Sequence, residues 1–292
     1  MVVTLKTGSS MAKVDTKGAE LVSLQDVFGT EYIWQKDPKF WARSSPLLFP
    51  IVGGLRDGKT TIKGRENAIP GHGFLRDAEF RLTYQAEDTA VFTTSATEET
   101  LAIYPYPFSL SLAYKLSETG ISVRYTVLNM GEGPMDFLIG AHPAFNTPVG
   151  GGAFEDCYLE FDAPEPDGCP RFDLEKGQFN MDMRIDYTGG GNRVDLKYRH
   201  FDHDALWFDQ PHSHVVRLKS AKTGRGVEVD FETFDTVAFW TPIGKEAPFL
   251  CIEPWNGMAP CSDEGNEYEK KRCVRHLDGN GQAEFRMKIT MI

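Results

Sequence analysis

The chain has 292 residues, 41% of them hydrophobic, and its formal net charge of −11 disfavours nucleic acid and anionic membranes as partners, because both need a concentrated basic surface. The opening Met-Val-Val-Thr-Leu-Lys lacks the apolar core of a signal peptide, and no apolar run approaches the length of a membrane span. The five cysteines are widely spaced and form no Cys-x-x-Cys pair, so we expect a reduced, cytoplasmic protein.

Apolar and polar residues alternate with a period of two along much of the chain, which predicts β-strands. Two such runs, residues 108–116 and 121–127, flank the turn-forming residues 118–120 and predict a hairpin. A second hairpin is predicted around residues 223–226, and residues 285–291 alternate in the same way. Because each run has one apolar face, the pattern favours antiparallel sheets over a buried parallel sheet.

Helical periodicity is scarce, and residues 263–276 are predicted to form only a short helical or irregular segment. The glycine runs at 150–152 and 189–191 are too short to separate domains, and no linker or low-complexity tract divides the chain. We therefore predict one all-β domain over residues 1–292, a large antiparallel β-sandwich.

Two polar residues stand in apolar surroundings. His142 follows the apolar residues 137–139 and precedes Pro143, which predicts a position at a strand end. Glu253 lies between Cys-Ile and Pro-Trp, where a carboxylate is seldom buried without a reason, and such neighbours would raise its pKa. Taken singly, they could be a core histidine and a structural or turn-capping carboxylate. Together they are a candidate acid–base pair.

Two glycine-rich segments carry further polar groups. Arg56 ends Pro-Ile-Val-Gly-Gly-Leu-Arg at a predicted turn, where a solvated loop arginine is the alternative. His72 lies in Pro-Gly-His-Gly-Phe, where the flanking glycines permit close backbone approach; an ordinary turn histidine is the alternative.

These four segments resemble the aldose 1-epimerase (mutarotase) family. Residues 140–146, Gly-Ala-His-Pro-Ala-Phe-Asn, are similar to its catalytic histidine segment, and residues 251–257, Cys-Ile-Glu-Pro-Trp-Asn-Gly, resemble its LacX-like branch. The resemblance implies a galactose mutarotase-like supersandwich that needs no cofactor and no metal. It assigns His142 as the acid that protonates the ring oxygen and Glu253 as the base.

The resemblance also implies a set of substrate-binding residues, namely Arg56, His72, Asp204, Trp255 and Asn146. Trp255 is expected as a wall of the sugar site, with a core position as the alternative. Two aspartates compete for the acidic position. The branch pattern Asp-Ala-Leu-x-Phe favours Asp204, which we choose, whereas the Asp-His-x-Phe pattern of galactose mutarotases favours Asp202.

Other functional classes fit the sequence less well. A loose histidine cluster could suggest a metal site, but its spacing matches no zinc pattern; its members are His200, His203, His212 and His214. A glycosidase needs two carboxylates at a set separation. A non-catalytic sugar-binding protein would need the binding residues but not both His142 and Glu253.

We therefore predict an isomerase that interconverts the α and β anomers of an aldose, with a small sugar as its partner and a monomer or homodimer as its assembly. A neutral aldose is favoured over a hexose 6-phosphate, because the matched segments bring only Arg56 and the nearby Arg76. The alternatives are a hexose-6-phosphate 1-epimerase and a non-catalytic carbohydrate-binding protein.

Overall fold

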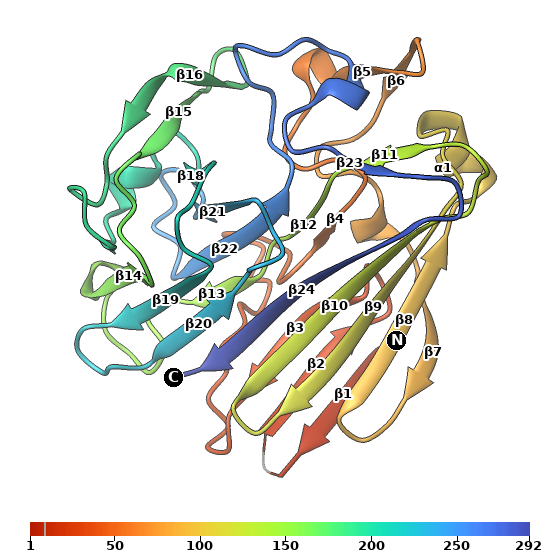
Figure 1. The fold of residues 1–292 in the computed structure, drawn as a ribbon. Helices are drawn as coiled ribbons and strands as arrows, with labels where there is room; N and C mark the ends of the chain where they lie inside the picture. Colours follow the sequence, from red (N-terminus) through yellow and green to blue (C-terminus); the bar gives the residue numbers. More distant parts are fainter. Residues whose placement is uncertain (9) are drawn as a thin grey trace.

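The computed structural model describes residues 1–8 and 10–292 and is built mainly from antiparallel strands (Figure 1). Its largest sheet has nine strands, in the spatial order β17 (Arg193–Asp195), β14 (Cys157–Phe161), β19 (Val215–Ser220), β20 (Gly226–Asp230), β24 (Gln282–Met291), β10 (Gly120–Asn129), β9 (Phe108–Ser117), β8 (Thr89–Ser95) and β7 (Arg81–Gln85). The long strands β24, β10, β9 and β8 run side by side through its middle (Figure 1).

A second sheet carries the chemistry-bearing segments. It contains β18 (Leu206–Phe208), β21 (Thr236–Trp240), β22 (Phe249–Asn256), β12 (Ile139–Ala141) and β4 (Leu47–Leu48), and β13 (Ala144–Asn146) pairs with β22. Side chains of the two sheets meet in one core: the ring of Phe161 on β14 lies 4.7 Å from Phe208 on β18 and 5.6 Å from Phe239 on β21. The two sheets therefore form a sandwich, as predicted.

Smaller elements complete the structure. The sheet of β1 (Val2–Thr7), β2 (Ser10–Asp15) and β3 (Glu20–Gln25) packs against β8 and β9. Three two-stranded sheets pair β5 (Lys59–Ile62) with β6 (Arg65–Ala68), β11 (Met135–Phe137) with β23 (Arg275–Leu277), and β15 (Cys169–Asp173) with β16 (Gln178–Ile185). The helices are α1 (Glu98–Ile103) and the 3₁₀ turns η1 (Arg56–Gly58), η2 (Leu75–Asp77), η3 (Phe154–Asp156), η4 (Tyr198–Phe201) and η5 (Tyr268–Lys270). Within residues 1–8 and 10–292, no helix has the length and apolar character needed to cross a membrane.

Both predicted hairpins are confirmed: β9 pairs with β10, and β19 pairs with β20. Residues 263–276 are largely irregular and contain η5 and the start of β23. The short helix α1 was not expected. It begins with a capping box in which Thr97 and Thr100 exchange side-chain-to-backbone hydrogen bonds. The main cluster of buried apolar residues includes residues from Val3 to Ile289. The prediction that residues 1–292 form a single domain stays a prediction.

Candidate active site

The strand register of the second sheet brings His142 and Glu253 together. β22 pairs with β12 at Gly140 and with β13 at Ala144 in the same register. His142 lies in the break between β12 and β13, so the register on either side places it opposite Glu253 in the middle of β22. The Nε2 atom of His142 is 3.1 Å from Oε2 of Glu253. Cross-strand neighbours on one face are near enough for such contact, although 111 positions of sequence separate them.

Both members of the pair are buried, with 7% of the His142 side chain and 3% of the Glu253 side chain exposed. Burial lowers the pKa of His142 well below its ordinary value, and the neighbouring His72 adds to the effect. Burial raises the pKa of Glu253 well above its ordinary value, and Asp204 contributes in the same direction. These directions favour a neutral pair in which one proton is held between the carboxyl and the imidazole.

Aromatic rings fix the orientation of His142. The ring of Trp41 stacks on the imidazole at a centroid distance of 5.0 Å and an interplanar angle of 25°. Trp240 meets the imidazole edge-on at 5.7 Å. Within residues 1–8 and 10–292, Nδ1 of His142 has no hydrogen-bond partner, so packing and the contact with Glu253 hold the ring.

The pair opens into a cavity of about 340 Å³, within the range of about 300–1,000 Å³ that is usual for small-molecule sites. Its ionisable lining residues are His72, Arg76, His142, Asp204 and Glu253. Its aromatic lining residues are Trp41, Phe172, Phe179, Trp207, Trp240 and Trp255. A few convergent polar groups between flat apolar walls suit a polyhydroxylated ring, whose C–H faces can pack on aromatic rings while its hydroxyls are hydrogen-bonded.

His72 is held as a neutral hydrogen-bond donor. Its backbone lies in the left-handed region at φ 63°, and its N–H donates to the Gly53 carbonyl at 2.7 Å. The Gly53 N–H in turn donates to Nδ1 of His72 at 3.2 Å. Burial, with Arg76 and Arg43 nearby, lowers the pKa of His72 to about 3. Because Nδ1 accepts, the neutral ring carries its proton on Nε2.

Of the two competing aspartates, the structure places Asp204 in the cavity lining and leaves Asp202 exposed. Asp204 follows η4 and has a φ of 73°, and its N–H donates to the Phe201 carbonyl at 3.0 Å. Burial raises the pKa of Asp204. Trp255 also lines the cavity, with its ring 5.6 Å from His72.

Two of the predicted binding residues are not brought into the cavity. Arg56 donates through Nη2 to the carbonyls of Cys261 at 2.8 Å and Glu264 at 3.1 Å, so its guanidinium ties η1 to a neighbouring loop. Asn146 donates through Nδ2 to the carbonyls of Glu31 at 3.0 Å and Ile33 at 3.3 Å. Neither side chain is among the lining residues, which corrects their placement. Both satisfy backbone carbonyls instead.

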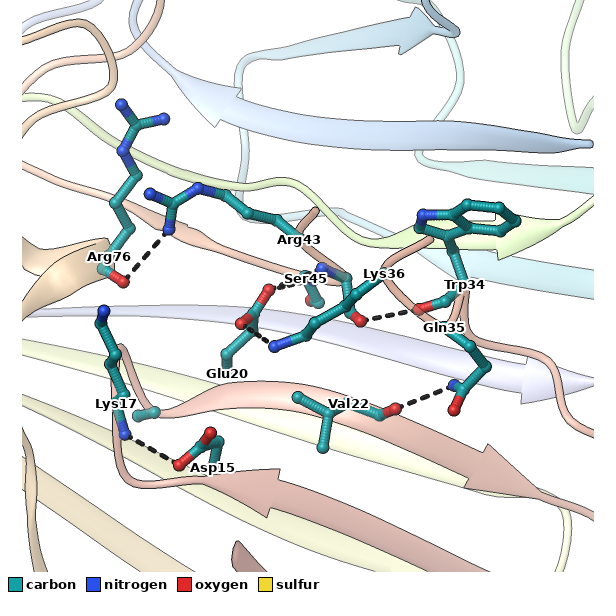
Figure 2. A network of polar contacts seen from close by, with 12 residues as sticks. Asp15, Lys17, Glu20, Val22, Trp34, Gln35, Lys36, Arg43, Ser45 and Arg76 are labelled. Carbon is teal, nitrogen blue, oxygen red and sulfur yellow. Dashed lines mark hydrogen bonds and ion pairs between the residues drawn. The ribbon is translucent and has the colours of Figure 1, made fainter. Parts of the chain in front are cut away.

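Arg76, unlike Arg56, is among the residues that line the cavity. It lies in η2, four residues after His72, and its side chain lines the cavity. The adjacent Arg43 donates to the Arg76 carbonyl at 3.4 Å (Figure 2). Arg43 is also paired with Asp77 at 3.0 Å. Asp77 thus pairs closely with Arg43, and its carboxylate is 3.9 Å from Nε of Arg76, whose side chain lines the cavity. The spacing from the Pro-Gly-His-Gly-Phe motif was the available sequence signal for Arg76; Trp41 and Trp240 had none.

One group of side chains could hold a metal ion. Ligand atoms of His142, Cys251 and Glu253 lie within 4.8 Å of one another, and imidazole, thiolate and carboxylate are all zinc ligands. Burial raises the pKa of the Cys251 thiol well above its ordinary value, however, which opposes formation of the thiolate that would bind. In the described part of the chain, the histidines at 200, 203, 212 and 214 form no such group.

Comparisons with known proteins identify the family and the fold. The family model described as aldose 1-epimerase matches residues 1–273. Protein LacX (plasmid) of Lactococcus lactis subsp. lactis is 36% identical over 278 residues, which cover 93% of each chain. A galactose mutarotase-like protein from Lactobacillus casei superposes with a TM-score of 0.93 at 27% identity over all of both chains. A galactose mutarotase related enzyme from Lactobacillus acidophilus has a TM-score of 0.91 at 27% identity, over 100% of this chain and 97% of that one.

Proposed function

The chain belongs to the aldose 1-epimerase family, and we propose that it is itself an aldose 1-epimerase, which interconverts the α and β anomers of a sugar. The observation that carries the proposal is the buried contact of 3.1 Å between His142 and Glu253 at the wall of a sugar-sized cavity. A protein that only binds sugar has no need to keep two transferable-proton groups in contact there.

The reaction needs two proton transfers on one substrate. Glu253, as the carboxylate, takes the proton from the C1 hydroxyl, and the C1–O bond to the ring oxygen breaks. The electron pair of that bond goes to the ring oxygen, which takes a proton from the imidazolium of His142, and C1 becomes the aldehyde carbon. Rotation about C1–C2 presents the other carbonyl face, and the reverse transfers close the ring as the other anomer.

The resting pair must supply both charged forms. Burial favours the neutral arrangement, with the proton on Glu253. Transfer of that proton across the 3.1 Å contact produces the carboxylate base and the imidazolium acid together. Ring opening returns the pair to its neutral arrangement, because the carboxylate gains a proton and the imidazolium loses one. No proton has to come from solvent during turnover.

The remaining cavity residues have the chemistry to hold sugar hydroxyls. His72 offers an Nε2–H donor, Arg76 a guanidinium, and Asp204 a carboxyl group. Trp255 is an aromatic wall against which the C–H face of a sugar can pack.

A neutral aldose fits this lining better than a hexose 6-phosphate. Recognition of a phosphate dianion usually requires several convergent cationic donors. Among the described residues that line the cavity, Arg76 is the one arginine or lysine, and the nearby Arg43 is already paired with Asp77. We therefore propose a free aldose as the substrate.

The proposal is tested by NMR exchange spectroscopy between the H1 signals of the two anomers, run over a panel of aldoses and hexose 6-phosphates. Accelerated exchange of a free aldose, above the protein-free rate, is the expected result. Asp204→Asn should raise KM, whereas the matched control Asp202→Asn, in the exposed neighbour, should not. Binding without accelerated exchange for every sugar would leave a carbohydrate-binding protein and refute the enzyme. Preference for a phosphorylated sugar would refute the substrate class alone.

A further inference from the structure

One wall of the cavity is made by a segment that belongs to neither large sheet. Residues 36–45, here called the Trp41 segment, connect the region after β3 to β4, and Trp41 projects from them onto His142. Only a short turn supports the segment locally, in which the N–H groups of Phe40 and Trp41 both donate to the Asp37 carbonyl at 3.0 Å. Its position must therefore be set by contacts with the rest of the molecule.

The two ends of this segment are held by the carboxylate of Glu20, at the start of β3 (Figure 2). Its middle is held by Arg43, which pairs with Asp77, and by Lys245, which donates to the Phe40 carbonyl. Oε1 of Glu20 accepts the backbone N–H groups of Ser44 at 2.7 Å and Ser45 at 3.0 Å. Oε2 accepts from Nζ of Lys36 at 2.6 Å. One carboxylate thus holds both ends of the Trp41 segment.

Ser44, which is bound to Glu20, also forms a hydrogen bond with β13, the strand that follows His142. Its carbonyl accepts the N–H of Ala144 at 2.8 Å, two residues after His142. Its hydroxyl donates to the Trp34 carbonyl at 2.7 Å, and Nε1 of Trp34 donates to the Trp41 carbonyl at 2.8 Å. A continuous set of hydrogen bonds therefore links Glu20 to Trp41, which stacks on His142, and to β13, which follows His142 in the chain.

Glu20 is buried, so its carboxylate depends on the hydrogen bonds described above. The residue is 7% exposed, and a buried carboxylate requires a full set of donors. Lys36, its cationic partner, has a left-handed backbone at φ 62°, a conformation that residues other than glycine adopt only where the surroundings enforce it.

We propose that Glu20 is a positioning residue for the His142–Glu253 pair: it fixes the Trp41 segment so that Trp41 covers the imidazole and excludes water from it. The inference rests on the function proposed above for that pair. Loss of the Glu20 carboxylate frees both ends of the segment, which lets Trp41 shift on the ring and admits water to His142. Because burial is what lowers the pKa of His142, that pKa then rises toward its ordinary value.

Most of the groups that act on His142 lie outside the Trp41 segment and stay in place in this comparison. The titratable and charged groups near its ring come from several elements and are Glu253, Cys251, His72, Arg76 and Arg43. None of them bonds to Glu20. Arg43 belongs to the Trp41 segment and helps to lower the pKa of His142, so its displacement would raise that pKa in the same direction as loss of the cover by Trp41.

The test compares Glu20→Ala with Glu31→Ala as a matched control. Glu31 is also a partly buried carboxylate that accepts backbone N–H groups, those of Leu24 and Ile33, but it makes no bond to the Trp41 segment. The readouts are the pKa of His142, from histidine ring NMR with His142→Gln for assignment, and kcat and KM for the best aldose. Glu20→Ala should raise the pKa of His142 and lower kcat/KM roughly ten- to a hundredfold, the effect expected of a reacting group displaced by about 1 Å.

Glu31→Ala should leave both quantities near their wild-type values even if it lowers the melting temperature. Glu20→Gln, which keeps an oxygen for the two serine N–H groups, should restore most of the activity. If Glu20→Ala does not fold, Lys36→Met takes its place, with the same direction and a smaller size expected. An unchanged pKa and unchanged kinetics, or equal changes in both carboxylate variants, would overturn the proposal. The NMR measurement needs no turnover, so a shift in the His142 pKa without any aldose activity supports the anchor and refutes the proposed function.

Discussion

The glutamine substitution of Glu253 separates the chemistry of the site from its architecture. Glutamine has nearly the same shape as glutamate, and its amide can donate to Nε2 of His142 across the contact that is 3.1 Å in the wild type. It cannot take up the proton of the C1 hydroxyl. Loss of one general-base transfer should lower kcat by ~10²–10⁴-fold, which is about 2.7–5.4 kcal/mol of activation free energy.

The same substitution should not lower the stability of the fold at high pH, although it lowers activity. The pKa of Glu253 is raised in the folded chain, so above the unfolded value of about 4.3 the folded state holds a proton that the unfolded state has released. This carboxyl therefore lowers the free energy of unfolding as pH rises through the interval between the two pKa values. Glu253→Gln lacks this contribution, and it should be at least as stable as the wild type at pH 8, by denaturant unfolding.

The anomer exchange rate and the unfolding free energy at pH 5 and pH 8 are measured on the same preparations. Full activity in the glutamine variant would refute the role of Glu253. A variant that is less stable than the wild type at pH 8, by the same margin as at pH 5, would refute the reasoning about its buried carboxyl.

Three further predictions concern the rest of the site. Arg76→Ala should raise KM and leave the fold intact. Arg56→Ala should lower the free energy of unfolding by roughly 1.5–3 kcal/mol and leave the kinetics unchanged, because its guanidinium bonds to two backbone carbonyls. The reverse pattern, measured by kinetics and denaturant unfolding, would indicate that Arg56 binds substrate and Arg76 does not. His72 has a pKa lowered to about 3, so the unfolded chain binds a proton that the folded chain does not between pH 6.5 and pH 3, and stability falls as pH falls through that interval. His72→Gln should therefore show a shallower loss of melting temperature on acidification, and an identical loss would contradict the burial argument. Dialysis against a chelator should leave the exchange rate unchanged; activity that is lost on chelation and restored by zinc would instead indicate a metal-dependent reaction.

The strands could be predicted from sequence because alternation is a local signal, and His142 and Glu253 could be paired as candidates because each lies in a distinctive local segment. Alternation predicts the strands, and both hairpins form where turn residues separate two alternating runs. The segments around His142 and Glu253 are unusual enough to be matched to a family without structural information. Asp204 could be preferred over Asp202 only from a short pattern, and the structure places Asp204 in the lining.

The positions of Arg56, Arg76 and Trp41 relative to the cavity could not be predicted from sequence, because they depend on how loops pack against one another. Arg56 and Arg76 follow similar glycine-containing turns, and only the tertiary structure shows that one guanidinium bonds to carbonyls near Cys261 while the other lines the cavity. Trp41 is far from every recognised motif, and its stacking on His142 depends on the anchor at Glu20. Such contacts join segments that carry no shared sequence pattern.

The central claim, that His142 and Glu253 act as one proton-transferring unit, is tested most directly by a double-mutant cycle. The anomer exchange rate is measured for the wild type, His142→Gln, Glu253→Gln and the double variant on one aldose, with the protein-free rate subtracted. Residues that act as a unit give strongly non-additive losses, so the double variant should be about as slow as the slower single variant. Losses that multiply, or full activity in either single variant, would contradict the account.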